Sequence, residues 1–193
     1  MDASTFRAVA HKEDARIFDE FLKHGFDINS TEFEEPILRL SVKNPNFVQF
    51  LLDRGADSNI KNYRGVSAVA TAVLFPLSSS LYILLSHGAK LDPGILHQAM
   101  RPMANRLSTS GGPEMIQYLL KNGADMNHIS ADHGTPLHYA AYMYLKEAAQ
   151  LLLDAGTDSN MVVDSLTPAD LAKIQGNMEL YELLVAKSAL SNQ

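Results

Sequence analysis

The chain has 193 residues, of which 46% are hydrophobic and 20% charged, with a formal net charge of −6; this mixture excludes the disordered and collagen-like classes. Its 16 lysines and arginines are scattered, which argues against general nucleic-acid binding, because phosphate neutralisation needs clustered cations. The absence of cysteine excludes disulfides, thiolate metal sites and cysteine nucleophiles.

One phrase of nine residues recurs along the chain, and we call it the glycine phrase. It reads FLKHGFDIN at 21–29, LLDRGADSN at 51–59, LLSHGAKLD at 84–92, LLKNGADMN at 119–127 and LLDAGTDSN at 152–160. Its glycines, Gly25, Gly55, Gly88, Gly123 and Gly156, are separated by 30, 33, 35 and 33 residues. The chain is therefore predicted to consist of repeats of about 33 residues.

The residue types of the glycine phrase predict a local structure. Its leading apolar pair stands at the end of an amphipathic helix, and the glycine can take the left-handed conformation that ends a helix. The Asp and Asn residues that follow bond readily to nearby backbone groups and favour a turn. Each repeat is therefore predicted to contain two helices followed by an extended finger.

The segments between the phrases are predicted to begin each repeat with its first helix. In chain order they are STFRAVA at 4–10, PILRLSVKNPNFVQFLLDRG at 36–55, SAVATAV at 67–73, LHQAM at 96–100, TPLHYAA at 135–141 and TPADLAK at 167–173. Thr135 can cap a helix, and Pro136 fits the first turn, where no donor is lost. Ala140 and Ala141 keep the helix thin enough to stack on its neighbours.

The period, together with GTPLHYAAYMYLKEAAQLLLDAG at 134–156, resembles the ankyrin repeat family. The resemblance covers roughly residues 3–190 and implies an all-α ankyrin-repeat solenoid of about six helix-turn-helix units with short extended fingers. The approximate units are 1–30, 31–60, 61–92, 93–127, 128–160 and 161–190, with a polar tail at 191–193. It also implies a polar outer face on the last unit, which Glu179, Glu182 and Lys187 suit.

The fourth unit departs from the family pattern. Its finger is short, because LHQAM at 96–100 comes early, and RPMANRLSTSGGP at 101–113 makes the turn between its two helices longer than in the family. Its Ser, Thr and Gly residues favour flexibility. We predict a surface loop at 101–113, and its two arginines leave open a binding or regulatory role.

The resemblance also implies a concave binding face, made by the fingers and by two positions after the paired alanines of each first helix. Those positions hold mainly apolar residues, which often mark an interaction site when they are exposed. The alternative is a register shifted by one residue, with some of them in the core. The pairs are Leu74 with Phe75, Arg101 with Pro102, Tyr142 with Met143 and Ile174 with Gln175; Tyr63, Arg64, His128, Ile129 and His133 on the fingers, with Arg106 in the insertion, extend the face.

Catalytic and metal-binding signals are weak in this sequence. It contains no phosphate-binding loop, no H-E-x-x-H and no G-x-S-x-G motif. His97 and His138 occupy the position of the family's structural histidine, which bonds to backbone. His128, His133 and Asp132 are residue types that bind metals, but no fourth ligand is indicated. We expect no metal and no cofactor.

Three hypotheses on function follow. The first is an interaction module that binds a protein segment on the concave face, with Leu74, Phe75, Tyr142 and Met143 as anchors. The second is an atypical enzyme or small-ligand protein with a pocket beside the 101–113 insertion, where Arg101, His97 and Tyr142 supply polar groups. The third is a rigid spacer.

The first hypothesis implies a monomer that binds a protein partner and neither nucleic acid nor membrane. The N-terminal residues do not form a secretory signal, and no run of 18 apolar residues is present. We therefore expect a cytoplasmic or nuclear protein. The weak catalytic motifs favour a protein without enzymatic activity, and the second hypothesis keeps an enzyme as the alternative.

Overall fold

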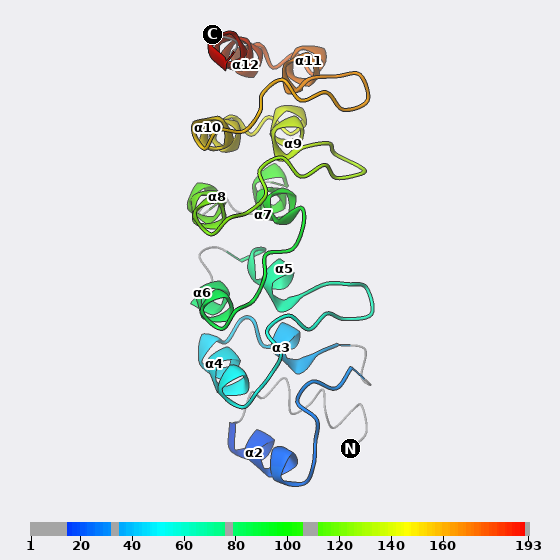
Figure 1. Cartoon of the computed structure of the whole chain (residues 1–193), viewed down its shortest axis with the longest axis vertical. Coiled ribbons are helices and arrows are strands. Elements are labelled where there is room, and N and C mark those ends of the chain that lie inside the picture. Colours follow the sequence, from blue (N-terminus) through cyan, green and yellow to red (C-terminus); the bar gives the residue numbers. More distant parts are fainter. Residues whose placement is uncertain (1–14, 32–34, 76–78, 106–111, 192–193) are drawn as a thin grey trace. The chain divides into compact units, whose positions relative to one another are not determined.

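A computed structural model describes residues 15–31, 35–75, 79–105 and 112–191 of the protein (Figure 1). Eleven helices and no sheet are formed in this part of the chain, so the predicted all-α class is confirmed. The helices are α2 (Ala15–Lys23), α3 (Ile37–Leu40), α4 (Pro45–Asp53), α5 (Ala68–Ala72), α6 (Ser79–Ser86), α7 (Ile95–Ala104), α8 (Gly112–Lys121), α9 (Pro136–Tyr142), α10 (Lys146–Asp154), α11 (Pro168–Ile174) and α12 (Met178–Ser191).

The chain divides into two compact units, Met1–Asp92 and Pro93–Gln193. In the first unit α3 packs on α5, and α4 packs on α6. In the second unit α7, α9 and α11 pack in succession, and each also contacts its own following helix, α8, α10 or α12 (Figure 1). Both units are thus stacks of helix pairs.

Three short turns project from the stacks, and we call them fingers 61–67, 128–134 and 161–167 (Figure 1). Each is closed by one isolated antiparallel bridge: Lys61 with Ser67, Ser130 with Gly134, and Val163 with Leu166. The predicted extended fingers are therefore present in the third, fifth and sixth repeats.

The glycine phrase ends the second helix of the first five repeats as predicted. All five phrase glycines have φ between 80° and 92°, in the left-handed region that a Cβ disfavours. The backbone N–H that follows the glycine then donates to a carbonyl in the last helical turn, as Ala56 does to Leu51 at 3.1 Å.

The Asp and Asn of the phrase form a turn and then connect neighbouring repeats. In the turn, the Asp carboxylate accepts the N–H two residues later, at 2.9 Å for Asp57 and Asn59. The Asn59 amide then donates to the carbonyl of Gly88 at 3.3 Å and accepts from the N–H of Lys90 at 2.8 Å. Asn29 makes the same pair of bonds to Gly55 and Asp57.

The third phrase ends in Asp92 where the others have Asn. The Asp92 carboxylate accepts from Ser67 and lies 2.6 Å from the ammonium of Lys61, so it bonds to residues of its own unit. A carboxylate cannot donate a hydrogen bond as an amide does. The division between the two compact units falls directly after this residue.

The first part of the 101–113 insertion is helical, which corrects the predicted loop. Helix α7 continues through Arg101 and Pro102 to Ala104, and α8 begins at Gly112. The reason is helical spacing, because Met103 follows the buried Leu96 and Met100 at intervals that keep it near the same face. Arg106 and the rest of the Ser/Thr/Gly stretch, 106–111, lie outside the described residues.

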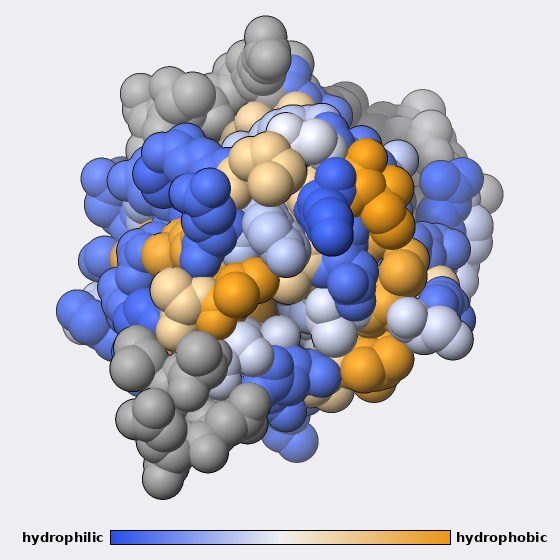
Figure 2. All heavy atoms as spheres, turned by 90° about the horizontal axis from the view of Figure 1, so that it is seen from above, coloured by the Kyte–Doolittle hydropathy of each residue, from blue (hydrophilic) through white to orange (hydrophobic). Residues whose placement is uncertain are grey.

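Figure 2 looks from above Figure 1, where the C-terminal helices lie, and shows hydrophobic residues among hydrophilic ones. Glu179 and Glu182 are exposed, in line with the predicted polar outer face. Ile174, Met178 and Val185 are exposed as well. The surface of the last repeat is therefore mixed rather than uniformly polar.

Gly112 lets α7 and α8 approach each other. A Cβ placed on it would lie 2.6 Å from both Cγ and Sδ of Met103, closer than packed atoms tolerate. We predict that Gly112→Ala lowers the free energy of unfolding by about 1 kcal/mol, because the added methyl forces the flexible Met103 side chain to shift out of its packed position.

Chemical denaturation of the wild type, Gly112→Ala, Met103→Ala and the double variant measures this effect. In the Met103→Ala background the glycine substitution should be close to neutral, since the clashing side chain is gone. Equal or greater stability of Gly112→Ala in the wild-type background would contradict the packing assignment.

Candidate functional site

The four predicted pairs lie at the C-terminal ends of α5, α7, α9 and α11, the first helices of their repeats, which we call the inner helices. In each pair one residue is exposed to solvent. The first members are exposed: Leu74 by 41%, Tyr142 by 49%, Ile174 by 64%, and Arg101 likewise. The second members, Phe75, Pro102, Met143 and Gln175, are half-buried. Phe75, for example, lies beneath the Lys43 ammonium, 5.0 Å from its ring centre. Fewer apolar side chains are therefore fully exposed on the inner helices of each unit than the sequence predicted.

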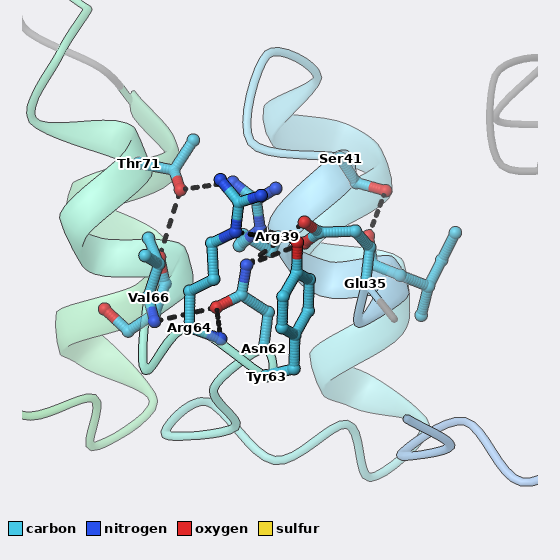
Figure 3. A network of polar contacts seen from close by, with 10 residues as sticks. Glu35, Arg39, Ser41, Asn62, Tyr63, Arg64, Val66 and Thr71 are labelled. Atoms are coloured by element: carbon cyan, nitrogen blue, oxygen red, sulfur yellow. Dashed lines mark hydrogen bonds and ion pairs between the residues drawn. The ribbon is translucent and has the colours of Figure 1, made fainter. Parts of the chain in front are cut away.

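Finger 61–67 carries Tyr63 and Arg64 at its tip, and both are exposed (Figure 3). The Arg64 Nε donates to the Tyr63 hydroxyl at 2.7 Å, so the two side chains hold each other. Below them, the side-chain oxygen of buried Asn62 accepts from the N–H groups of Arg64 and Val66 at 3.0 and 2.9 Å. Asn62 therefore fixes the shape of the finger.

Asn62 also connects the finger to the repeat before it (Figure 3). Its amide nitrogen donates to both carboxylate oxygens of Glu35 at 3.1 and 3.2 Å, and Glu35 is paired with Arg39. Burial by itself raises the pKa of Glu35, but hydrogen bonds from Arg39 and Asn62 and the nearby arginine charges outweigh it and leave the pKa lowered. Glu35 is thus held as a carboxylate.

In the second unit, His138 joins α9 to the next finger. Its Nε2 donates to the carbonyl oxygen of Leu166 at 3.1 Å, and its Nδ1 lies 2.7 Å from the hydroxyl oxygen of Thr135. Both ring nitrogens therefore have partners, with a proton on Nε2 and the Thr135 hydroxyl as donor to Nδ1. Burial lowers the pKa of His138, consistent with a neutral ring.

His97 occupies the matching place on α7 but lacks one of these partners. Its Nε2 lies 3.0 Å from the carbonyl oxygen of Gly134, and its Nδ1 is buried without a hydrogen bond. The residue three positions earlier is Gly94, where His138 has Thr135. A Cβ on Gly94 would lie 3.3 Å from Cδ2 of His128 and 3.8 Å from Nδ1 of His97, so the His128 ring lies where a threonine side chain would begin.

A hollow of about 490 Å³ opens beside His97, between α7 and finger 128–134. It brings together three histidines and an arginine singled out in the sequence with one tyrosine, Tyr139, and one acidic residue, Asp132. Arg101 lies one helical turn after His97, and the ring of buried Tyr139 lies 5.8 Å from that of His97 and 4.9 Å from that of His133. The hollow is lined by Pro93, Gly94, His97, Gln98, Arg101, His128, Ser130, Asp132, His133 and Tyr139.

A second hollow, of about 350 Å³, lies on the other side of the same finger. Tyr142 lines it together with apolar residues of the next repeat, Val163, Leu166 and Leu171. Asp132, His133 and Tyr139 line both hollows. Finger 128–134 thus separates a polar hollow from a more apolar one.

The sequence prediction missed several residues of these hollows. Gly94, Tyr139 and the apolar lining residues of finger 161–167 were not singled out. Only Gly94 left a signal, because it stands where the same motif in later repeats has threonine. Conversely, among the residues that the structure describes, no group of three or more His, Cys, Asp or Glu side chains is arranged to hold a metal ion.

The role of Asn62 generates one prediction. Asn62→Ala leaves the N–H groups of Arg64 and Val66 without their partner and leaves Glu35 with Arg39 as its remaining partner, so we expect the free energy of unfolding to fall by about 1–3 kcal/mol. Denaturant titration checks this, with Asn46→Ala at an exposed position of α4 as the matched control. A loss no larger than that of the control would show that the network contributes nothing.

The two buried histidines generate a pH prediction. Burial lowers the pKa of His97 and His138 below 6.5, so just below that pH the unfolded chain binds more protons than the folded one. The free energy of unfolding should therefore be highest above about pH 6.5. It should decrease as the pH is lowered from this value toward the pKa values of the folded protein.

Denaturant titrations between pH 7.5 and 5.5 measure this dependence. His138→Gln keeps a donor near Leu166 but cannot titrate, so its curve should be flatter than that of the wild type. A wild-type stability that stays constant or rises on acidification would contradict the assignment of neutral, buried imidazoles.

Comparison with known proteins identifies the family to which the chain is related. The family described as ankyrin repeats (3 copies) matches residues 96–193. The chain is 27% identical to the mouse (Mus musculus) B-cell lymphoma 3 protein homolog over 156 residues, which are 78% of this chain and 35% of that protein. It is 26% identical to the human (Homo sapiens) transient receptor potential cation channel subfamily A member 1 over 151 residues, covering 74% of this chain and 13% of that one.

A solved structure has the same fold. The ankyrin repeat domain of Bcl-3 superposes with a TM-score of 0.75 at 24% sequence identity, covering 90% of this chain and 79% of that one. The chain spans about a third or less of the two curated relatives, and within its described part no helix is long and apolar enough to cross a membrane. The family match over half of its length and the stacked helix pairs show that the chain belongs to the ankyrin repeat family.

Proposed function

We propose that this chain is a protein-binding module whose recognition surface consists of the fingers and the exposed C-terminal ends of the inner helices. The carrying observation is the exposure of Tyr142 and Ile174 at matching positions of successive repeats, with Tyr142 at the edge of a hollow of about 350 Å³. Exposed apolar and aromatic side chains beside a concave, apolar surface are typical of partner-binding sites.

The fold supplies the rigidity that such recognition needs. Within each unit buried polar groups connect neighbouring repeats, as Asn62 does to Glu35 and His138 does to Leu166, so fingers 61–67 and 161–167 are held before binding. A pre-organised surface loses little conformational entropy when a partner binds. In the first unit, Tyr63 and Arg64 on a finger and Leu74 at the end of an inner helix supply the same residue types.

A small-molecule ligand or an atypical enzyme is the second candidate. The observation in its favour is the polar hollow of about 490 Å³ beside His97 and Arg101, a volume within the range of ligand pockets. A metabolite that co-purifies with the wild type and is lost in Arg101→Ala would favour this candidate over the first.

Site-specific cross-linking tests the leading proposal. We predict that a photoreactive benzoyl-phenylalanine at position 142 forms adducts with a discrete set of proteins in lysate, and that the same residue at Val185 does not. Val185 is also exposed and apolar but lies on α12, away from the fingers. Equal adducts from both positions, or none from position 142, would contradict the proposed surface.

A further inference from the structure

The hollow beside His97 is lined by Arg101, for which the described part of the chain supplies no carboxylate partner. Among the described residues Arg101 forms no ion pair, whereas Arg39 and Arg54 pair with Glu35 and Asp19. Burial raises the pKa of Tyr139 in this hollow, and the nearby charge of Arg101 opposes that rise. Arg101 is therefore a fixed positive charge that faces a concave surface.

The second observation is the unpartnered Nδ1 of His97. The residue is only 6% exposed, and its Nε2 is engaged by Gly134, so Nδ1 is the remaining polar atom of a buried ring that lines the hollow. Buried polar atoms are rarely left without a partner. In the equivalent place on α9, Nδ1 of His138 has a hydrogen-bond partner, the hydroxyl group of Thr135.

The charges around the hollow define the ligand that it suits. Arg101 and His97 come from α7, His128, Asp132 and His133 from finger 128–134, and Tyr139 from α9. Arg101 is the fixed cation of this group, and Asp132 is its carboxylate. One guanidinium can pair with one carboxylate in a bidentate way, whereas the negative charge of Asp132 opposes a doubly charged phosphate, so the hollow favours a carboxylate.

The hollow lined by Tyr142 indicates which type of side chain the ligand carries next to its carboxylate. It shares Asp132, His133 and Tyr139 with the polar hollow and is lined by Tyr142, Val163, Leu166 and Leu171. A single extended segment that crosses finger 128–134 therefore meets a polar hollow and an apolar one in turn. Such a surface fits a segment with an acidic side chain near an apolar one.

We propose that the hollow between α7 and finger 128–134 binds an Asp or Glu side chain of the protein partner, with Arg101 as its cation, while the Tyr142 hollow holds a neighbouring apolar side chain. Nδ1 of His97 takes up a proton on binding and then donates toward the carboxylate. This inference rests on the proposed function, because it assigns the chemistry of the partner to the same surface.

Selection from a phage library of random 12-residue peptides tests the proposal with a defined probe. Peptides retained by the wild type should contain Asp or Glu near Leu, Ile, Val or Phe. A selected peptide and its Glu→Gln or Asp→Asn counterpart are then titrated against the wild type, Arg101→Gln and Lys121→Gln. Lys121→Gln is the control because it removes an exposed cation from the end of α8, outside the fingers and the inner helices.

The expected result is a loss of about tenfold in affinity for the acidic peptide with Arg101→Gln, against no loss with Lys121→Gln. The amide counterpart should bind the wild type and Arg101→Gln equally, and the acidic peptide should bind more tightly at pH 6 than at pH 8. Equal binding of the acidic peptide by the wild type and Arg101→Gln, or equal affinity at both pH values, would overturn the inference.

The failures of the two proposals can be distinguished. Peptides that lose binding with Tyr142→Ala but carry no acidic preference would leave the binding surface standing and refute the carboxylate site. Peptides indifferent to both Tyr142→Ala and Arg101→Gln, or no retained peptides, would refute both. Retention of phosphopeptides in preference to acidic ones, or of a free metabolite at Arg101, would also overturn the carboxylate assignment.

Discussion

The bond from an asparagine side chain of one repeat to the backbone of the next is the constraint on which the stack depends. An ankyrin repeat is too small to bury its own apolar faces, so its stability comes from the interface with its neighbours. The Asn59 amide satisfies a carbonyl and an N–H in the following glycine phrase, at backbone groups that the end of the helix leaves free. Because one amide both donates and accepts, it fixes the spacing and the register of two repeats together.

Two histidines in equivalent places show how a regular scaffold acquires a site. His138 has a partner for each ring nitrogen and serves as a structural connection. His97 keeps the bond to the next finger but has lost the hydroxyl, because Gly94 replaces threonine. The scaffold contact is thus preserved while one polar atom is left unused beside a hollow. Such a departure from a repeating pattern, in a repeat that otherwise folds normally, is where function is expected.

Much of the fold could be predicted because it is local. The glycine phrase specifies a helix end and a turn within nine residues; the structure has the helix end at all five occurrences and the Asp turn at four, the exception being the third phrase, which has Lys90 in place of Asp. The structural roles of His97 and His138 also followed from the family pattern. The extension of α7 did not, because Pro102 reads as a helix breaker while the packing of Met103 against Gly112 depends on a second helix.

The candidate site was predictable only in part, since it depends on which side chains meet across repeats. The sequence placed Arg101, His128, His133 and Tyr142 on the inner surface, but not the two hollows on either side of finger 128–134. It also could not show that Phe75 is half-buried under Lys43, a contact between residues 32 positions apart. The shape of a hollow and the charges that line it depend on contacts between repeats, which the repeating sequence pattern does not specify.

Asp92 carries a consequence for how the protein loses its structure. In a linear array, nearest-neighbour couplings make unfolding cooperative, and a chain with one weak junction separates into blocks that melt independently. The asparagine connection is replaced by Asp92, whose carboxylate turns back to Lys61 and Ser67, and the two compact units divide there. Heating or denaturant should then produce two transitions, and a destabilising substitution should shift only the transition of the unit that contains it.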